Sequence, residues 1–330
     1  MKKIIMYTVH DGEKDAIKEW ASNNNYDITY NDVILNKDTV ILAQGYDGIC
    51  IQQTQLIDDE FVYQKLHEYG FKHLSLRIAG YDIINMEYAK KYQLLISIVP
   101  AYSPNAVAEM ALSHTMYLTR KMYHNIAKVN HHNFTWDGSL ANEIRSMTIG
   151  VIGFGRIGRI YAQIMKAIGA RVIVYDVIKP NDLEGCLFIN NLDDLLKKAD
   201  VISIHIPLTK DTKYLICEDT LKLMKPTAYL INTSRGAIVN TNDLVFALEH
   251  QLIAGAGLDT LECESDYFEK DFGNDTISDS NFNKLLAMNN VLITPHISFY
   301  TTTALKNMVD IGLDNIKTLL EDGECLNIVT

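Results

Sequence analysis

Three polar residues in the second half of the chain follow short apolar segments with the length of β-strands. Arg235 follows YLINTS, Glu264 lies beyond GAGLD, and His296 follows VLITP. Because ligands of open α/β sheets bind outside the carboxyl ends of the strands, three loops can bring a cation, a carboxylate and an imidazole to one crevice. Taken singly, Arg235 could be a surface charge, Glu264 a solvated acid and His296 a structural histidine. Together they favour a site that binds an anion and transfers a proton.

A glycine-rich turn precedes these residues in the chain. The motif GFGRIG, at residues 153–158, follows the apolar segment TIGVI and opens the helical stretch RIGRIYAQIMKAIG. Gly153 allows a tight turn, Gly155 lets a pyrophosphate approach the backbone, and Gly158 allows the helix to pack closely on the strand. The order of strand, glycine turn and helix predicts a dinucleotide site.

The identity of the dinucleotide depends on the next strand, RVIVYD, which ends in Asp176. A carboxylate at this position accepts hydrogen bonds from the adenosine ribose and repels a 2′-phosphate, which favours NAD over NADP. Lys179 lies near enough to soften that repulsion. The first helical N–H groups, at Arg156 and Ile157, would face the pyrophosphate. Alternatively, the glycines serve packing alone and Asp176 is a turn residue.

Strands and helices must position these residues. Short apolar segments alternate with amphipathic stretches along the chain, which is typical of parallel sheets covered by helices. The first hundred residues contain candidate strands at 3–9, 27–30, 48–52, 73–77 and 94–99, and helices at 13–23, 59–69 and 86–92. A long helix is expected at 106–129. A second series contains strands at 148–153, 171–176, 201–205, 228–233, 255–259 and 291–294, and helices at 157–168, 193–198, 220–224 and 242–250. The final helix, 302–320, is expected to return to the first domain.

Composition excludes several classes of protein. The chain has 330 residues, of which 48% are hydrophobic, and carries 30 Lys and Arg against 41 Asp and Glu, a net charge of −11. This apolar fraction excludes a disordered chain, and the negative charge argues against general nucleic-acid binding. The five cysteines, none in a CxxC pair, indicate reduced thiols and no zinc site: Cys50, Cys186, Cys217, Cys263 and Cys325. No apolar stretch is long enough for a membrane span, so we expect a cytoplasmic protein without a membrane partner.

Several motifs together resemble the D-isomer-specific 2-hydroxyacid dehydrogenases, especially the bacterial D-lactate and D-2-hydroxyisocaproate dehydrogenases. The matching segments are GVIGFGRIG, HIPL, NTSRG, GLDTLECE and TPHISFY, with SLRIAG and VPAYSPNAVAE in the first third of the chain. The resemblance covers nearly the whole chain. It implies an α/β fold of two doubly wound parallel-sheet domains. A Rossmann NAD-binding domain at 101–298 would be inserted into a flavodoxin-like substrate (catalytic) domain formed by 1–100 and 299–330.

The resemblance also implies a role for each matching residue. Arg235 would hold the carboxylate and keto oxygen of a 2-keto acid, His296 would donate a proton to that oxygen, and Glu264 would keep His296 protonated. The backbone N–H groups of the 78–80 loop would also bind the carboxylate; its residues are Ile78, Ala79 and Gly80. The nicotinamide end of NAD would lie against Pro207, Thr233 and Asp259.

Substrate size depends on the side chains around that site. An aromatic residue often closes the pocket of lactate-preferring members at the position of Gln52, so the glutamine predicts a wider or more polar pocket. Tyr102, Phe299 and Tyr300 could narrow it from other sides, or serve core or interface packing. Phe154 is bulkier than the residue usual in the glycine turn and predicts local repacking.

The resulting hypothesis is reversible, NADH-dependent reduction of pyruvate to D-lactate by a homodimer built through the cofactor domain, with 106–129 as a candidate interface. One alternative keeps the mechanism with a bulkier substrate such as 2-ketoisocaproate or phenylpyruvate. Another is an NADH-sensing corepressor-like binding protein. We expect no metal: the pair His131–His132 is interpreted as solvated or dimer-facing, and the acidic segment 262–279 as an exposed loop without calcium-binding spacing.

Overall fold

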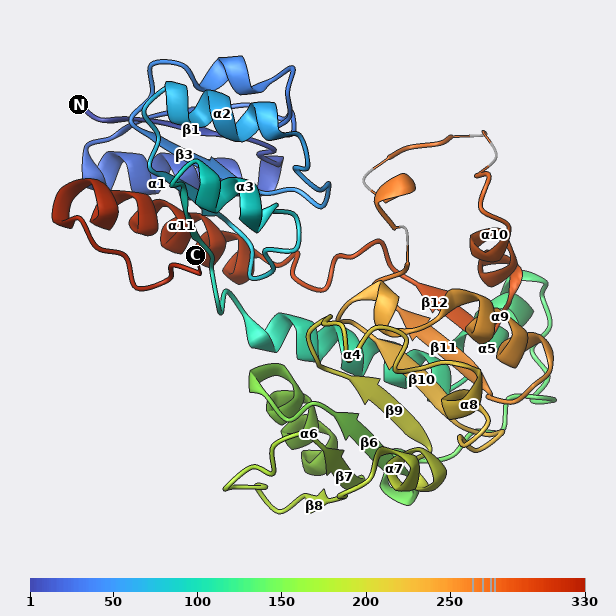
Figure 1. The fold of residues 1–330 in the computed structure, drawn as a ribbon. Coiled ribbons are helices and arrows are strands. Elements are labelled where there is room, and N and C mark those ends of the chain that lie inside the picture. The colour runs from blue at the N-terminus through green and yellow to red at the C-terminus, as the bar shows by residue number, and fades with distance from the viewer. Residues whose placement is uncertain (263, 269, 274, 276, 330) are drawn as a thin grey trace. The chain divides into compact units, whose positions relative to one another are not determined.

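The computed structural model describes residues 1–262, 264–268, 270–273, 275 and 277–329. It divides into two compact units (Figure 1). Unit 1 is Met1–Ser103 with Tyr300–Thr330, and unit 2 is Pro104–Phe299. The middle of the chain therefore forms one unit and its two ends form the other. Cys263 lies outside the described residues.

Unit 1 contains a five-stranded parallel sheet in the order β2-β1-β3-β4-β5, the order of a flavodoxin-like doubly wound sheet. The strands are β1 (Lys3–Met6), β2 (Asp27–Tyr30), β3 (Gly48–Ile51), β4 (His73–Leu76) and β5 (Leu95–Ser97). The alternation within β1 assigns its two faces. Ile5 packs with the side chains of α2 and α3, whereas Ile4 and Met6 pack with those of α1 and α11.

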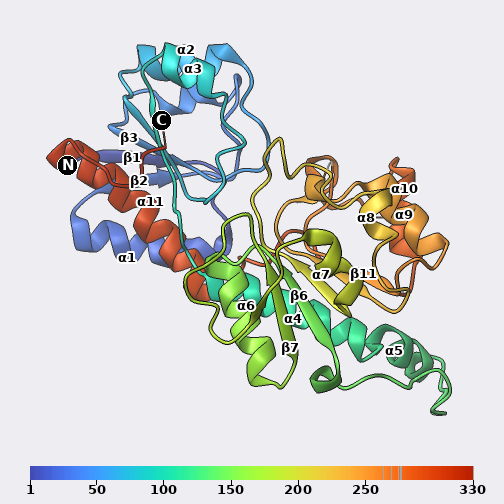
Figure 2. The ribbon, with the colours of Figure 1, turned by 60° about the horizontal axis from the view of Figure 1, so that its bottom comes forward.

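Helices cover both faces of this sheet. They are η1 (Asp11–Glu13), α1 (Lys14–Asn24), η2 (Val40–Ala43), α2 (Glu60–Glu68), α3 (Met86–Lys91) and α11 (Thr302–Asp322). The last helix, α11, lies beside α1 (Figures 1 and 2) and packs on β3 and β4 through Val309, Leu313 and Ile316. The Ser75 hydroxyl donates to the Gly312 carbonyl at 2.7 Å, which ties α11 to β4.

Unit 2 contains a seven-stranded parallel sheet in the order β12-β11-β10-β9-β6-β7-β8. The strands are β6 (Thr148–Ile152), β7 (Arg171–Tyr175), β8 (Leu187–Phe188), β9 (Val201–Ile204), β10 (Tyr229–Asn232), β11 (Gly255–Leu258) and β12 (Val291–Ile293). In chain order this is the dinucleotide-binding arrangement 3-2-1-4-5-6 with a seventh strand added. The predicted α/β class with two parallel sheets is confirmed.

The helices of unit 2 separate into two layers (Figures 1 and 2). The helices are α4 (Pro104–Thr119), α5 (Met122–Asn130), η3 (Ile144–Ser146), α6 (Arg156–Ala167), α7 (Leu192–Lys198), α8 (Glu218–Leu221), η4 (Gly236–Ile238), α9 (Thr241–Glu249), η5 (Glu264–Asp266) and α10 (Ser280–Ala287). One core joins the sheet to α4 and α6, and the other joins it to α7, α8, α9 and α10. These layers leave the carboxyl edge of the sheet to loops.

Three details differ from the prediction. The expected helix 106–129 is two helices, because Lys121 adopts a left-handed conformation with φ +49° between α4 and α5. The two-residue strand β8 and the helix α10 were not predicted.

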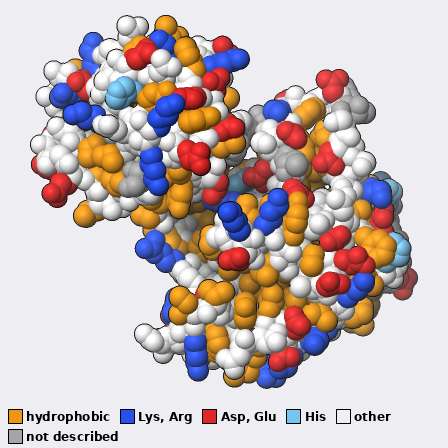
Figure 3. Space-filling model, in the orientation of Figure 1, with side chains coloured by type: hydrophobic (Ala, Val, Ile, Leu, Met, Phe, Trp, Pro, Cys, Tyr) orange, Lys and Arg blue, Asp and Glu red, His pale blue; other side chains and the backbone are white. Residues whose placement is uncertain are grey.

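Acidic and basic side chains are interspersed over the visible face of the molecule (Figure 3). Within the described part of the chain, no helix has the length and apolarity needed to cross a membrane.

Candidate active site

The glycine turn lies where β6 meets α6. Gly153 has φ +91°, and a Cβ there would lie 2.5 Å from the His205 carbonyl oxygen. A Cβ on Gly158 would lie 2.0 Å from the Gly153 carbonyl oxygen, so this glycine lets α6 pack against the turn. By contrast, nothing lies within 4 Å of a Cβ built on Gly155. Internal packing therefore explains two of the glycines, while the third leaves open space at the helix N-terminus, a place where helices can bind an anion.

Asp176 closes this turn from the end of β7. Its Oδ2 accepts a hydrogen bond from the Phe154 N–H at 2.7 Å, and its Oδ1 accepts one from the Ile178 N–H at 3.2 Å. Phe154 is buried in the core beneath α6, and the Arg159 guanidinium stacks on its ring at 4.6 Å from the centroid. The bulky residue is thus accommodated by the core. Arg156 is exposed and Ile157 half-buried on the first turn of α6.

The carboxyl ends of β10 and β11 carry polar groups that fit a bound cofactor. The Thr233 and Thr260 hydroxyls are buried, and neither has a hydrogen-bond partner among the described residues. An unsatisfied buried hydroxyl is costly, and a polar ligand would relieve that cost. Pro207 lies exposed after β9. Together with the open space at Gly155, these groups fit NAD; Thr260 was not predicted.

Glu264 and His296 form the centre of the site. His296 Nδ1 lies 2.6 Å from Glu264 Oε1, and Glu264 Oε2 accepts the Leu261 N–H at 2.8 Å. Burial lowers the pKa of His296, but the hydrogen bond and charge of Glu264 outweigh it, so the pKa is raised above its ordinary value. The Arg235 charge opposes this rise in pKa and the Asp259 charge supports it. The imidazole is therefore suited to hold a proton near neutral pH.

Asp259 was predicted to lie near the nicotinamide, and the structure shows that it also holds the loop at residues 296–298. It is fully buried; its Oδ1 accepts the Ile297 N–H at 3.0 Å and its Oδ2 accepts the Ser298 N–H at 2.9 Å. Its carbonyl accepts the His296 N–H at 2.8 Å. His296 itself has φ +53°, a conformation that non-glycine residues rarely adopt. Asp259 therefore holds the loop that presents His296 in a strained conformation.

Arg235 lies close enough to His296 for its charge to lower the pKa of the imidazole. The buried Asn232 side chain shapes its loop by donating to the Arg235 carbonyl at 3.0 Å and accepting the Ser234 N–H at 3.1 Å. Gly236 permits close approach of the next loop, since a Cβ there would lie 2.0 Å from the Leu261 carbonyl carbon. The structure thus brings together Arg235, Glu264 and His296.

Unit 1 carries a second group of predicted residues at the carboxyl edge of its own sheet. Gln52 follows β3, and its buried Oε1 has no hydrogen-bond partner among the described residues. Ile78, Ala79 and Gly80 follow β4 and are half-buried. Within the described chain, no hydrogen-bond acceptor is recorded for the Ala79 and Gly80 N–H groups. Free N–H groups beside a sheet edge can bind a carboxylate.

The aromatic residues predicted for the pocket occupy different places. In unit 2, the Phe299 ring meets the His296 ring edge-on, with centroids 6.5 Å apart. In unit 1, the Tyr300 ring is half-exposed and lies 6.4 Å from the His10 ring, after β1. Tyr102 follows β5, and its carbonyl accepts from the Asn307 side chain at 2.6 Å.

A buried ion pair supports the 78–80 loop and was not predicted. Arg77 and Glu13 are both fully buried, and Arg77 Nε donates to Glu13 Oε1 at 2.9 Å. Arg77 Nη2 also donates to the Thr8 carbonyl at 3.0 Å, and the His10 N–H donates to Glu13 Oε2 at 2.9 Å. The pair connects the end of β1 to the residue preceding the loop. No local sequence signal indicates it, because its members are 64 positions apart.

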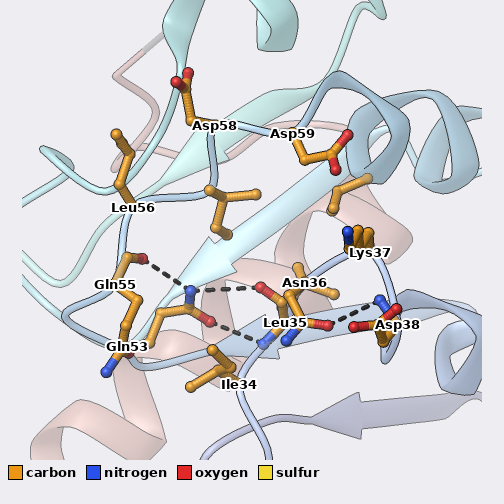
Figure 4. Close-up of a pocket in the computed structure, with 12 residues that line it drawn as sticks. Ile34, Leu35, Asn36, Lys37, Asp38, Gln53, Gln55, Leu56, Asp58 and Asp59 are labelled. Carbon is orange, nitrogen blue, oxygen red and sulfur yellow. Dashed lines mark hydrogen bonds between the residues drawn. The ribbon is translucent and has the colours of Figure 1, made fainter.

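Other polar groups lie outside this site. A cavity of about 250 Å³ separates the 34–38 loop from the 55–59 segment (Figure 4). The Gln53 side chain connects the two segments that line this cavity: it accepts a hydrogen bond from the Leu35 N–H at 2.9 Å and donates one to the Gln55 carbonyl at 2.9 Å. His131 Nδ1 contacts the Ala127 carbonyl at 2.8 Å. Among the described residues, no group of three or more His, Cys, Asp or Glu is arranged to hold a metal.

The acidic segment 262–279 is not wholly an exposed loop, which corrects the prediction. Tyr267 and Phe268 are buried, and the Tyr267 ring stacks on Phe282 of α10 with centroids 4.2 Å apart. Asp279 accepts the Asn281 N–H at 2.8 Å and caps α10. The aromatic residues within the segment override its acidic composition because burying them removes a large apolar surface from water.

A dinucleotide-binding sheet whose edge carries a paired imidazole and carboxylate near an arginine is the arrangement expected of a nicotinamide-dependent oxidoreductase. Residues 112–298 match the family model described as "D-isomer specific 2-hydroxyacid dehydrogenase, NAD binding domain". The D-2-hydroxyacid dehydrogenase (NAD(+)) of Clostridioides difficile is 39% identical over 99% of both chains. The D-lactate dehydrogenase of Lactiplantibacillus plantarum is 40% identical over 98% of this chain and 97% of that one.

Solved structures agree with these sequence matches. The NAD-complexed D-isomer specific 2-hydroxyacid dehydrogenase of Lactobacillus delbrueckii ssp. bulgaricus has 44% identity and a TM-score of 0.87, covering 100% of both chains. A D-2-hydroxyisocaproate dehydrogenase has 36% identity and a TM-score of 0.91 over 99% of both chains. The chain belongs to the D-isomer specific 2-hydroxyacid dehydrogenase family, and its cofactor is NAD.

Proposed function

We propose that this enzyme catalyses the reversible, NADH-dependent reduction of pyruvate to D-lactate. The observation that carries the proposal is the 2.6 Å contact between His296 Nδ1 and Glu264 Oε1, with Arg235 near enough to influence the pKa of His296. Relatives such as those of Lactiplantibacillus plantarum and Staphylococcus epidermidis are named D-lactate dehydrogenase, which supports this substrate.

Each side chain has a distinct part in that reaction. NADH supplies the hydride to C2 when bound, and negative charge then develops on the keto oxygen. The Arg235 guanidinium donates bidentate hydrogen bonds to the substrate carboxylate and stabilises that charge. Because Nδ1 of His296 is engaged by Glu264, Nε2 delivers the proton to the keto oxygen and completes the hydroxyl group.

Further residues of each unit are assigned to substrate binding in this proposal. In unit 1, the Ala79 and Gly80 N–H groups are assigned as donors to the substrate carboxylate, and Gln52, Tyr102 and Tyr300 are assigned to the substrate side chain. In unit 2, Phe299 is assigned to the substrate side chain. Two observations support the assignment of the 78–80 loop. No described acceptor is bonded to the Ala79 and Gly80 N–H groups, and the loop lies at the carboxyl edge of its sheet.

The decisive measurement is the loss of NADH absorbance with pyruvate, followed by oxidation of D-lactate and L-lactate with NAD. We expect turnover with pyruvate and with D-lactate alone. The His296→Ala variant should lose nearly all turnover while still binding NADH, because the proton donor is removed and the glycine turn is intact. Turnover of L-lactate, or an unimpaired His296→Ala enzyme, would contradict the proposal.

Substrate breadth is tested with 2-ketoisocaproate, phenylpyruvate and hydroxypyruvate in the same assay. The buried Gln52 amide favours a substrate that offers it a hydrogen bond, because leaving a buried polar atom unpaired is costly. A Gln52→Leu variant should therefore lower kcat/KM for hydroxypyruvate several-fold more than kcat/KM for pyruvate. Equal effects on the two substrates would remove Gln52 from substrate selection.

We also propose that the enzyme is a homodimer assembled through unit 2. Phe134, Trp136 and Leu140 are 72%, 90% and 88% exposed, and Ile126 and Val129 of the neighbouring α5 are also exposed. An apolar surface of this kind is typical of a subunit interface. Light scattering should give twice the 37.3 kDa chain mass, and Trp136→Glu should shift the protein toward the monomer. A monomeric native protein would refute this assembly.

We propose a cytoplasmic location for the enzyme. All four described cysteines, Cys50, Cys186, Cys217 and Cys325, are free thiols, which suits a reducing compartment. Fractionation of the source cells with an antibody against the chain should place it with the soluble proteins. Recovery in the membrane or secreted fraction would contradict this location.

A further inference from the structure

A buried histidine on α4 has no part in the proposed reaction. His114 is 1% exposed and lies in the middle of the helix, beside β11. Desolvation by burial lowers the pKa of His114 below its ordinary value, although the nearby Asp259 charge and a contact with the Gly257 backbone act in the opposite direction. Its ring is therefore neutral at neutral pH, and it carries one N–H donor.

The donor of His114 can be assigned from its neighbours. Its Nε2 lies 3.0 Å from Thr294 Oγ1, and the Thr294 hydroxyl donates to Asp259 Oδ1 at 2.5 Å. Because a hydroxyl has a single proton, Thr294 accepts at its oxygen while it donates to Asp259. The contact with Thr294 therefore favours the proton of His114 at Nε2, and the buried Nδ1 then has no hydrogen-bond partner among the described residues.

This chain of hydrogen bonds ends at the catalytic loop. The Asp259 carboxylate that Thr294 contacts also accepts the Ile297 and Ser298 N–H groups, and the Asp259 carbonyl accepts the N–H of His296. The loop needs such support because His296 has φ +53°. A rotation of the Asp259 carboxylate would therefore shift the loop, and with it the imidazole that contacts Glu264.

We propose that His114 is a positioning residue that acts through Thr294 and Asp259 to hold His296 against Glu264. The catalytic consequence rests on the proposed function, whereas the effect on the His296–Glu264 contact does not. Among the described residues, the charges of Glu264, Asp259 and Arg235 shift the pKa of His296, and the charge of Asp259 shifts the pKa of His114. A donor at the position of Nε2 is the required feature, so an amide can replace the imidazole but an alkyl group cannot.

The experiment compares the full-length native enzyme with three variants. His114→Leu removes the donor, and His114→Gln supplies an amide donor in its place. Thr119→Val is the matched control, because Thr119 is a buried hydroxyl on the same helix that donates to the Thr115 carbonyl and lies outside this network. For each protein, kcat and KM for pyruvate, the NADH dissociation constant, and the pKa of His296 by histidine imidazole NMR are measured.

We expect His114→Leu to lower kcat about 10- to 100-fold, since small displacements of reacting groups have effects of this size. NADH affinity should stay within about twofold of the native value. The pKa of His296 should fall in His114→Leu and remain near the native value in His114→Gln and Thr119→Val. If His114→Leu does not fold, Thr294→Val breaks the same connection at its next link and should give the same two changes.

The proposal is overturned by native kcat and a native pKa of His296 in His114→Leu. It is equally overturned when Thr119→Val reproduces the changes, or when His114→Gln is as impaired as His114→Leu. A native enzyme that reduces no 2-keto acid would refute the proposed function alone, because the NMR comparison still tests the positioning of His296.

Discussion

The charge of Glu264 is expected to set the pH range of keto-acid reduction, and Glu264→Gln tests this. Glu264 makes two hydrogen bonds, accepting from His296 Nδ1 at 2.6 Å and from the Leu261 N–H at 2.8 Å. A glutamine amide keeps one acceptor and replaces the other by a donor. The variant therefore loses the negative charge and one of the two contacts, with little change in volume.

The magnitude follows from the type of hydrogen bond that is lost. A hydrogen bond to a charged partner contributes about 1.5–3 kcal/mol, which corresponds to about 10- to 150-fold in a protonation equilibrium. Glu264 raises the pKa of His296, so its loss lets the proton dissociate at lower pH. At alkaline pH the rate of pyruvate reduction should fall by this factor, and at acidic pH it should change little.

The assay is the pH dependence of kcat/KM for pyruvate reduction, which reports the titration of the free enzyme. Glu262→Gln is the matched control, because Glu262 contacts the Tyr214 hydroxyl and the Thr241 N–H instead of His296. The alkaline limb should move to lower pH in Glu264→Gln alone. An unchanged profile in Glu264→Gln, or an equal displacement in Glu262→Gln, would refute the reasoning.

Three further predictions concern the glycine turn, Asp176 and the buried ion pair of unit 1. Gly155→Ala should fold normally but bind NADH about tenfold more weakly. Gly158→Ala should fail to fold or lose NADH binding, because its Cβ would lie 2.0 Å from a carbonyl oxygen. Thermal unfolding measures the stability of each variant, and NADH fluorescence titration measures its cofactor affinity. Asp176→Asn keeps an acceptor for the Phe154 N–H but removes the charge, so kcat/KM for NADPH relative to NADH should rise about tenfold; an unchanged ratio would contradict the assigned role. Glu13→Gln leaves the buried Arg77 charge uncompensated and should lower the free energy of unfolding by about 3–5 kcal/mol in urea denaturation, and a change below about 1 kcal/mol would show the pair to be dispensable.

Much of the fold was accessible from local patterns in the chain. Apolar runs of strand length, separated by amphipathic helices, predict the two parallel sheets because the periodicity of each element reports which faces are buried. The glycine turn could also be predicted, because the conformation and close packing that require each glycine involve residues near it in the sequence. The two-residue strand β8 and the break at Lys121 were not, because neither is long enough to carry a periodic signal.

Some residues of the candidate site could likewise be predicted from the sequence, and others could not. Residue type and position at strand ends were sufficient to single out Arg235, Glu264 and His296. They could not indicate that Asp259 holds the His296 loop, because its backbone and side-chain contacts exist only once β11 and β12 lie side by side. They also could not indicate the pair Glu13–Arg77 or the connection from His114, whose members are brought together by packing.

The sequence by itself indicated the class of chemistry: a dinucleotide turn, an acid predicted to favour NAD, and an arginine, a carboxylate and an imidazole that follow strands. Only the tertiary structure decided how these groups behave. Whether His296 holds its proton depends on its burial, the 2.6 Å contact with Glu264 and the opposing charge of Arg235. The physical reason is that a pKa and an orientation are set by the surroundings of a group, and segments distant in the chain supply those surroundings.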